Sequence, residues 1–161
     1  MIKNKEKLHE VISYLIFGVL TTAVGMLTYF GILWLGENLL SIDPSESAFY
    51  FVRIAAQILH WIAAVLFAFF TNKRWVFTSA DKEVNVAKQL VIFAGGRLAT
   101  LGLDTLVTFG TVWVLQAVKY EAIDIKIISI TADVISKVVA SVFVIIVNYF
   151  ISKIFVFKDK K

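Results

Sequence analysis

The hydrophobic pattern of the chain consists of long apolar runs separated by short polar segments. Four runs stand out, near residues 11–35, 49–71, 89–116 and 127–152. A helix needs about 20 apolar residues to cross the hydrocarbon core of a bilayer, so each run is long enough to span it. The polar first ten residues are expected to form a helical lead-in at the membrane surface. The pattern therefore predicts an all-α membrane protein with four transmembrane helices.

The composition agrees with lipid as the surrounding solvent. Hydrophobic residues make up 59% of the 161 residues and charged residues 17%, whereas typical soluble domains have about 45–50% and about 25%. A chain of this length cannot bury such an excess in one small core. It contains no cysteine and two histidines, which argues against a disulfide framework and against a metal site. We expect no metal and no cofactor.

The basic residues indicate how the helices are oriented. Three precede the first span, four lie in residues 72–88 and four in the tail, whereas the two remaining loops hold none and two. Cytoplasmic loops of membrane proteins carry an excess of lysine and arginine. The count of 11 against 2 predicts a multi-pass protein of the cytoplasmic membrane with both termini in the cytoplasm.

A weak internal repeat divides the chain into two helical hairpins. Four residues at and just after the end of the second span recur 80 positions later: Phe70, Lys73, Val76 and Phe77 as Phe150, Lys153, Val156 and Phe157. A second motif recurs 79 positions later: Phe30-Gly31-x-x-Trp34 as Phe109-Gly110-x-x-Trp113. A hairpin returns the chain to its starting side, so the two copies form a parallel repeat. We predict one membrane domain over residues 1–161, with repeats at about 11–77 and about 89–157 and a site between them.

Ionisable side chains inside the spans are candidates for function, because each costs roughly 2.5–3.5 kcal/mol to insert at a helix centre. The polar side chains in or at the ends of the predicted spans are Arg53, His60, Arg97, Asp104, Asp133 and Lys137, with the amides Gln57, Asn72 and Asn148. Arg97 lies too deep to reach the interface easily. It also follows two glycines that should weaken the helix. A single histidine such as His60 is more often a packing residue than a proton relay.

Some of these charges have a structural alternative, which is pairing within the membrane. Arg53 can pair with Asp133 across the repeat, or reach the outer interface by snorkelling. Arg97 and Asp104 are seven residues apart and share a helix face. Asp133 and Lys137 are four residues apart and can pair along the fourth span. Each pair would leave fewer charges for a ligand.

A deep arginine and lysine accompanied by amides form a receptor suited to phosphate. Arginine offers a planar fork of donors, lysine a point charge, and asparagine a donor without charge. In a membrane the expected ligand is an anionic lipid headgroup, with its tail against apolar walls.

Several motifs resemble those of the GtrA-like family of four-helix membrane proteins. They are Tyr14-Leu-Ile-Phe-Gly18-x-x-x-Thr22, Ala68-x-x-x-Asn72-Lys-Arg-Trp-Val-Phe77, Phe93-x-x-x-Arg97, Lys137 and Asn148-Tyr-Phe. The resemblance implies a translocase that flips a polyprenyl-phosphate-linked sugar, such as undecaprenyl-phosphate glucose, across the cytoplasmic membrane. The sugar would modify O-antigen, teichoic acid or another cell-wall glycan. A partner glycosyltransferase would make the lipid-linked sugar on the inner face.

The resemblance and the polar side chains converge on Asn72, Arg97, Lys137 and Asn148. We expect Arg97 with Asn72 to capture the phosphate at the inner leaflet. Lys137 would hold it nearer the outer leaflet, while Asn148 lines the passage. The prenyl tail would stay in lipid, so that only the headgroup crosses.

The stretch around Asn72 is expected to form the mouth of this passage. Lys73 would lie there beside Asn72, where Trp75-Val76-Phe77 re-enters the inner interface. The expected supporting residues are Ala68, Phe93, Asp104, Asp133 and Arg53. In the second copy Ser152 stands in the place of Asn72, so equivalence of the two half-sites does not follow from the repeat.

Other classes of function fit a small four-helix protein less closely. A non-transporting scaffold that anchors a glycosyltransferase would also use cationic inner loops. A small multidrug-type exporter resembles this chain in size, but its signature is a carboxylate in the first span, and residues 11–35 contain none. No His/carboxylate or Ser/Lys cluster has catalytic spacing, so we expect no enzyme. The glycine-bearing faces favour a homo-oligomer, and no nucleic-acid partner is expected.

Overall fold

Long apolar helices dominate the computed structural model, which describes residues 2–43, 47–78, 84–125 and 128–158. Within these ranges, four helices are long and apolar enough to cross a membrane: α1 (Ile2–Asn38), α2 (Ala48–Thr71), α3 (Val86–Ala117) and α4 (Ala132–Ile151). The predicted all-α membrane fold is therefore confirmed, and the chain is a multi-pass membrane protein. The side on which the termini lie stays a prediction, and four of the counted cations lie outside the described residues: Lys82, Lys126, Lys160 and Lys161.

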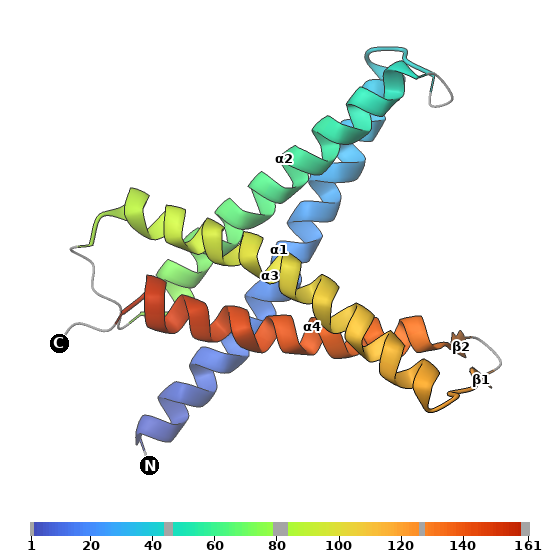
Figure 1. The fold of residues 1–161 in the computed structure, drawn as a ribbon. Coiled ribbons are helices and arrows are strands. Elements are labelled where there is room, and N and C mark those ends of the chain that lie inside the picture. The colour runs from blue at the N-terminus through green and yellow to red at the C-terminus, as the bar shows by residue number, and fades with distance from the viewer. Residues whose placement is uncertain (1, 44–46, 79–83, 126–127, 159–161) are drawn as a thin grey trace. The chain divides into compact units, whose positions relative to one another are not determined.

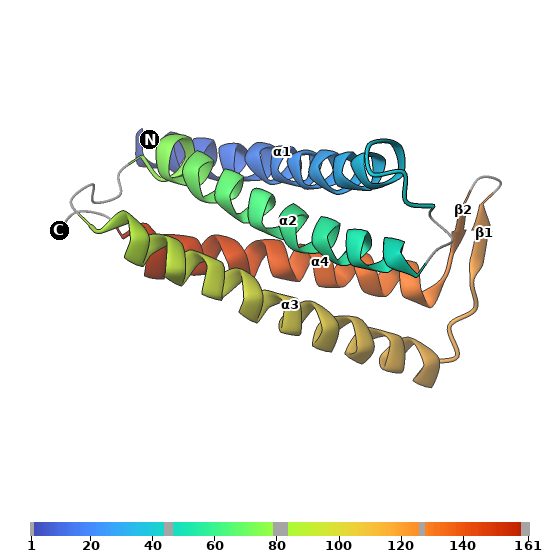
Figure 2. The same cartoon turned by 90° about the horizontal axis from the view of Figure 1, so that it is seen from above.

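The chain forms two compact units, Met1–Ala80 and Asp81–Lys161, which we call hairpin 1 and hairpin 2. In hairpin 1, α1 and α2 run antiparallel and side by side (Figure 1, Figure 2). In hairpin 2, α3 and α4 do the same (Figure 1, Figure 2). Large apolar side chains remain exposed along every one of these helices. Such faces fit a lipid environment, since a soluble protein rarely exposes extended apolar surface.

Each hairpin ends in a short π-helix that continues its second helix. These are η1 (Asn72–Val76) after α2 and η2 (Ser152–Val156) after α4. The Phe77 amide donates to the Asn72 carbonyl oxygen at 2.8 Å, and the Phe157 amide donates to the Ser152 carbonyl oxygen at 2.7 Å. These i to i+5 bonds define the π geometry. The chain therefore widens its helical turn there, and the expected re-entry of Trp75-Val76-Phe77 into the interface stays a prediction.

The wide turn brings an aromatic ring back onto the first helix of its own hairpin. Phe77 packs against Tyr14 of α1, with ring centroids 6.4 Å apart. Phe157 packs against Phe93 of α3, with centroids 6.1 Å apart. Both phenylalanines are buried. The sequence repeat thus has a structural counterpart at this end of each hairpin.

The fourth span begins later than the predicted residue 127. Strands β1 (Ile123–Ile125) and β2 (Ile128–Ile130) form an antiparallel pair in which Ile125 faces Ile128. Alternating β-branched residues favour a strand over a helix. The helix starts only after Thr131, whose side chain accepts a hydrogen bond from the Val134 amide at 3.3 Å. Threonine is a favourable N-cap because it satisfies a free helical amide.

Glycines allow close helix packing inside each hairpin. A Cβ atom on Gly25 would lie 2.7 Å from the His60 ring, and a Cβ on Gly96 would lie 2.8 Å from Ile151. Gly18 and Gly95 have no neighbour within 4 Å of such an atom. The helix α3 continues through both of its adjacent glycines. Gly96 therefore allows close packing against Ile151, and the expected weakening of the helix stays a prediction.

Candidate functional site

One face of α3 carries the candidate side chains of that helix together with two further polar ones. We call this face the α3 stripe; its residues follow spacings of four, four, three and four: Gln89, Phe93, Arg97, Thr100 and Asp104. Residues three or four apart lie above one another on a helix. Four members of the stripe contact α4, η2 or the residue that caps η2, as the following distances show. The stripe therefore lies at the helix interface inside hairpin 2.

The end of the stripe next to η2 is held by buried contacts. Gln89 Nε2 donates to the Val156 carbonyl oxygen at 3.2 Å, and the ring of Phe93 packs on Phe157. Gln89 and Phe93 are both almost fully buried. A carbonyl in the last turn of a helix has no intrahelical partner, so the Gln89 amide supplies one for Val156. These contacts fix α3 against the π-helical turn.

Arg97 is the cation of the stripe. Its Cζ atom lies 5.0 Å from the centroid of the Phe93 ring, in cation–π geometry. Eleven residues separate Arg97 from Val86 at the start of α3, which places it about 16 Å along the helix. Among the described residues, no carboxylate lies within ion-pair distance of its guanidinium. The expected pairing of Arg97 with Asp104 is therefore wrong, and Arg97 keeps a charge that can bind an anion.

Asn148 is fixed beside the backbone of Arg97. The Thr100 hydroxyl lies 3.1 Å from Asn148 Oδ1 and 3.0 Å from the Arg97 carbonyl oxygen. A hydroxyl has one proton, so it donates to one of these acceptors at a time. Asn148 is 4% exposed. Its amide is thus a buried, oriented group one turn from Arg97.

Lys137 forms an ion pair that the sequence had not indicated. Its Nζ atom lies 2.9 Å from Asp104 Oδ2 and joins α4 to α3. The side chain of Lys137 is 62% exposed and that of Asp104 is 29% exposed. The expected pairing of Lys137 with Asp133 along α4 is replaced by this contact between the helices. Asp133 itself lies exposed in the first turn of α4.

The other expected site residues belong to hairpin 1. Asn72 is 3% exposed and opens η1, so its amide is buried at the turn and does not stand at an open mouth. Lys73 follows it and is partly exposed. Ala68 is buried one turn earlier in α2. Arg53 lies near the start of α2 with its Cζ atom 5.2 Å from the Phe49 ring centroid. The meeting of Asn72 with Arg97, and of Arg53 with Asp133, would join the two hairpins and stays a prediction.

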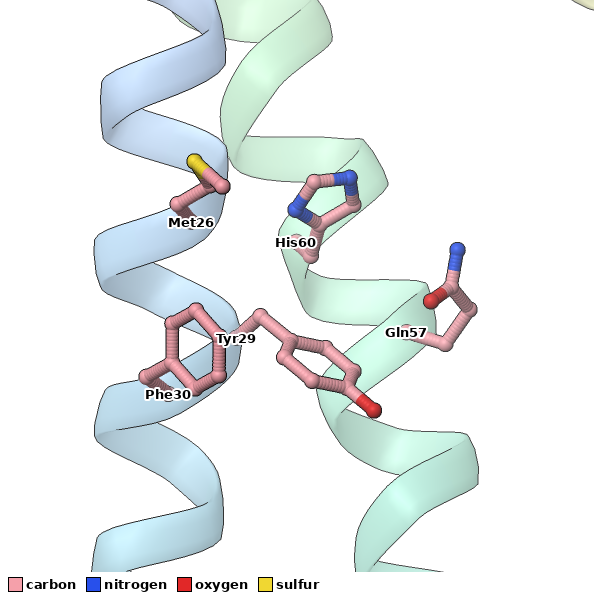
Figure 3. A pocket seen from close by; sticks show the side chains of 5 residues that line it. All are labelled: Met26, Tyr29, Phe30, Gln57 and His60. Atoms are coloured by element: carbon pink, nitrogen blue, oxygen red, sulfur yellow. The ribbon is translucent and has the colours of Figure 1, made fainter. Parts of the chain in front are cut away.

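Hairpin 1 has polar side chains near the middle of its helices, and they help to line a pocket of about 210 Å³. The pocket is lined by Met26, Tyr29, Phe30, Gln57 and His60 (Figure 3). Tyr29 extends from α1 towards α2, and its ring meets that of His60 edge-on at 6.2 Å (Figure 3). The His60 Nδ1 atom is buried without a hydrogen-bond partner among the described residues. This atom lies against Gly25, which supports the expectation of a packing histidine.

Two residues of the site, Gln89 and Thr100, were not found from the sequence. Both are uncharged, and the selection of candidates rested on charge and on the quoted motifs. Their spacing carried the signal, because Gln89 and Thr100 continue the helical face defined by Phe93 and Arg97. A search for polar residues in register with Arg97 would have found both.

Known proteins are similar to this chain over nearly its whole length. The GtrA/DPMS transmembrane domain family matches residues 13–157. The chain is 32% identical over 157 residues to the cell wall teichoic acid glycosylation protein GtcA of Listeria monocytogenes serovar 1/2a, an alignment that covers 97% of this chain and 90% of the relative. The protein of the same name in Listeria innocua serovar 6a is 31% identical with the same coverage. The uncharacterized membrane protein YwcD of Bacillus subtilis is 28% identical over 149 residues, which cover 92% of this chain and 96% of that protein. No solved structure matches the chain.

Proposed function

The chain belongs to the GtrA/DPMS transmembrane domain family, and from that premise we propose that it translocates a polyprenyl-phosphate-linked sugar from the inner to the outer leaflet of the cytoplasmic membrane. Two Listeria relatives are named for cell wall teichoic acid glycosylation, which supports a cell-wall polymer as the destination of the sugar. A membrane glycosyltransferase would supply the lipid-linked sugar. The chain itself would carry out no covalent step.

The observation that carries this proposal is that the Arg97 guanidinium has no carboxylate partner in the part of the chain that the structure describes. A sugar joined to a prenyl chain through one phosphate is a phosphodiester with a single negative charge. Arginine binds such a group through two parallel charge-assisted hydrogen bonds. Because Arg97 is far from either end of α3, a phosphate bound there would already lie within the membrane. Phe93 and Asn148 would hold the guanidinium and its backbone in place.

The remaining candidates extend this binding site along hairpin 2. Asn148 would donate its amide to the headgroup after Arg97, and Lys137 would receive the phosphate further along α3 and α4. Asn72 and Lys73 would act at the cytoplasmic end, provided that the termini are cytoplasmic as the basic residues predict. The prenyl tail would remain against the exposed apolar faces of the helices.

The proposal is tested by replacing Arg97 in cells that depend on this chain for glycosylation. Arg97→Ala should reduce the sugar on the cell-wall polymer to background, while the amount of protein in the membrane stays the same. Lys119→Ala is the matched control, because it removes a cation from the loop after α3 and should leave glycosylation unchanged. Wild-type glycosylation in the Arg97→Ala strain would overturn the proposal. It would favour a scaffold if the glycosyltransferase still copurifies with the variant.

A further inference from the structure

The ion pair between Lys137 and Asp104 lies at the place where the proposed path needs a cation. Asp104 is 18 residues into the 32-residue helix α3, so the pair is far from both ends of that helix. A lysine already neutralised by a carboxylate has less attraction for a phosphate. The pair therefore needs an explanation if Lys137 is to bind the headgroup.

The geometry of the pair leaves Lys137 open to a second anion. The contact uses one carboxylate oxygen, Asp104 Oδ2, at 2.9 Å. A lysine ammonium has three donors, and within the described residues Asp104 is the partner that Lys137 contacts. The side chain of Lys137 is 62% exposed. An incoming phosphate can thus reach Nζ without first breaking the contact with Asp104.

The charge of Arg97 completes a group of side chains whose net charge one bound phosphodiester can neutralise. Arg97 and Asp104 lie two turns apart on the same face of α3. With Lys137, these side chains carry a net charge of +1, and a phosphodiester of charge −1 brings the total to zero. The total stays zero whether the phosphate lies at Arg97 or at Lys137. Transfer of the headgroup from Arg97 to Lys137 therefore does not change the net charge of this group of side chains and phosphate.

We propose that Asp104 is a displaceable counter-ion for Lys137. It neutralises the lysine before the lipid arrives, gives way to the phosphate, and pairs with the lysine again to release the headgroup. This inference rests on the proposed translocation of a lipid-linked sugar. Asp104 is a positioning residue in this scheme, because it acts on the lipid through Lys137. A carboxylate that only joins the helices would have no such effect on binding.

The test measures binding and transport of farnesyl phosphoglucose with the full chain in lipid. Asp104→Asn should bind this probe about tenfold more tightly, a change of about 1.4 kcal/mol, because no carboxylate competes for Lys137. The same variant should transport the probe about tenfold more slowly, since tighter binding of an intermediate slows its release. If Asp104→Asn does not fold, Asp104→Ser makes the same prediction with a smaller side chain. Asp104→Glu keeps the carboxylate and should behave like the wild type.

Two further variants separate this effect from a general change of charge. Glu121→Gln also removes a carboxylate from hairpin 2, but Glu121 is exposed in the segment after α3 and makes no ion pair among the described residues. It should therefore bind the probe as the wild type does. Asp104→Asn combined with Lys137→Gln should lose the gain in affinity. An equal gain in Glu121→Gln, or a gain that survives the loss of Lys137, would overturn the inference.

The outcomes also distinguish this inference from the proposed function. If the wild type binds and transports the probe and Arg97→Ala does neither, the proposed translocation stands. In that case, weaker or unchanged binding by Asp104→Asn would show that the ion pair of Asp104 with Lys137 only holds α3 against α4. If the wild type does not bind the probe, the proposed function fails and the inference fails with it.

Discussion

The two hairpins have similar closing turns but differ in the side chains along the middle of their helices. Each closes with a π-helical turn whose phenylalanine returns to the first helix, at Phe77 and Phe157. Between the ends, uncharged residues of hairpin 1 stand where hairpin 2 has polar or charged ones. With first helices related by 79 positions and second helices by 80, the aligned pairs are Gly18 and Arg97, Gly25 and Asp104, Gln57 and Lys137, and Ala68 and Asn148.

From this difference we propose that the repeat has divided two tasks. In hairpin 1 the missing side chain of Gly25 makes room for His60, so this glycine serves helix packing. In hairpin 2 the aligned position holds Asp104, which pairs with Lys137. A repeat can keep its packing ends while one copy acquires a polar interior. We therefore place the chemistry in hairpin 2.

The largest effect that tests this comparison is expected from the two arginines. Arg97 and Arg53 both lie four residues after a phenylalanine and over its ring. Arg97→Ala should lower transport at least about tenfold, since a hydrogen bond to a charged group is worth roughly 1.5–3 kcal/mol. Arg53→Ala should stay within about twofold, because Arg53 lies near the start of α2 in hairpin 1, outside the proposed binding site of hairpin 2. Transport by equal amounts of reconstituted protein measures both, and similar losses would refute the division of tasks.

The two closing phenylalanines provide a second comparison. Phe157→Ala and Phe77→Ala each remove a buried ring and should lower the free energy of unfolding by about 3–5 kcal/mol. Phe157 also supports Phe93, which lies under Arg97. Transport per folded molecule should therefore fall in Phe157→Ala and stay near the wild type in Phe77→Ala. Denaturation in detergent and transport assays give the two values; equal transport in both variants would contradict the link from Phe93 to Arg97.

A smaller effect is expected where glycines pack. Gly25→Val should destabilise hairpin 1 by about 1–3 kcal/mol, the usual range for overpacking, because its Cβ would meet the His60 ring at 2.7 Å. Gly18→Val is the matched control on the same helix, since a Cβ there has no neighbour within 4 Å. The difference between their midpoints of thermal unfolding measures the effect. Equal midpoints would show that His60 moves aside without cost.

The fold was largely predictable from the sequence because the bilayer restricts the possible structures. A long apolar run in lipid must be helical to satisfy its backbone, and the predicted end of the second span at residue 71 agrees with α2 (Ala48–Thr71). The hydrophobic pattern did not predict the structure where local backbone geometry determines the secondary structure. The isoleucines before Thr131 form a strand pair, and a π-helical turn differs from an α-helical one by a single hydrogen-bond register.

The site was predictable in its charges and not in their pairing. Arg97 and Lys137 were selected because ionisable groups in a span are costly, and both lie at the interface of α3 and α4 or beside it. Which carboxylate neutralises which cation depends on how two helices are rotated against each other. Spacing along one helix favoured pairs of Asp104 with Arg97 and of Asp133 with Lys137, whereas helix packing pairs Asp104 with Lys137.

The central claim is that hairpin 2 carries a lipid-linked sugar across the bilayer through Arg97. The most direct measurement places the purified chain in vesicles with radiolabelled farnesyl phosphoglucose in both leaflets, and follows oxidation of the sugar by external, membrane-impermeant periodate. The wild-type chain should make nearly all of the sugar accessible over time, whereas vesicles with Arg97→Ala should expose only the half that starts in the outer leaflet. Equal rates for the two proteins, or no exposure of the inner half by either, would contradict the account.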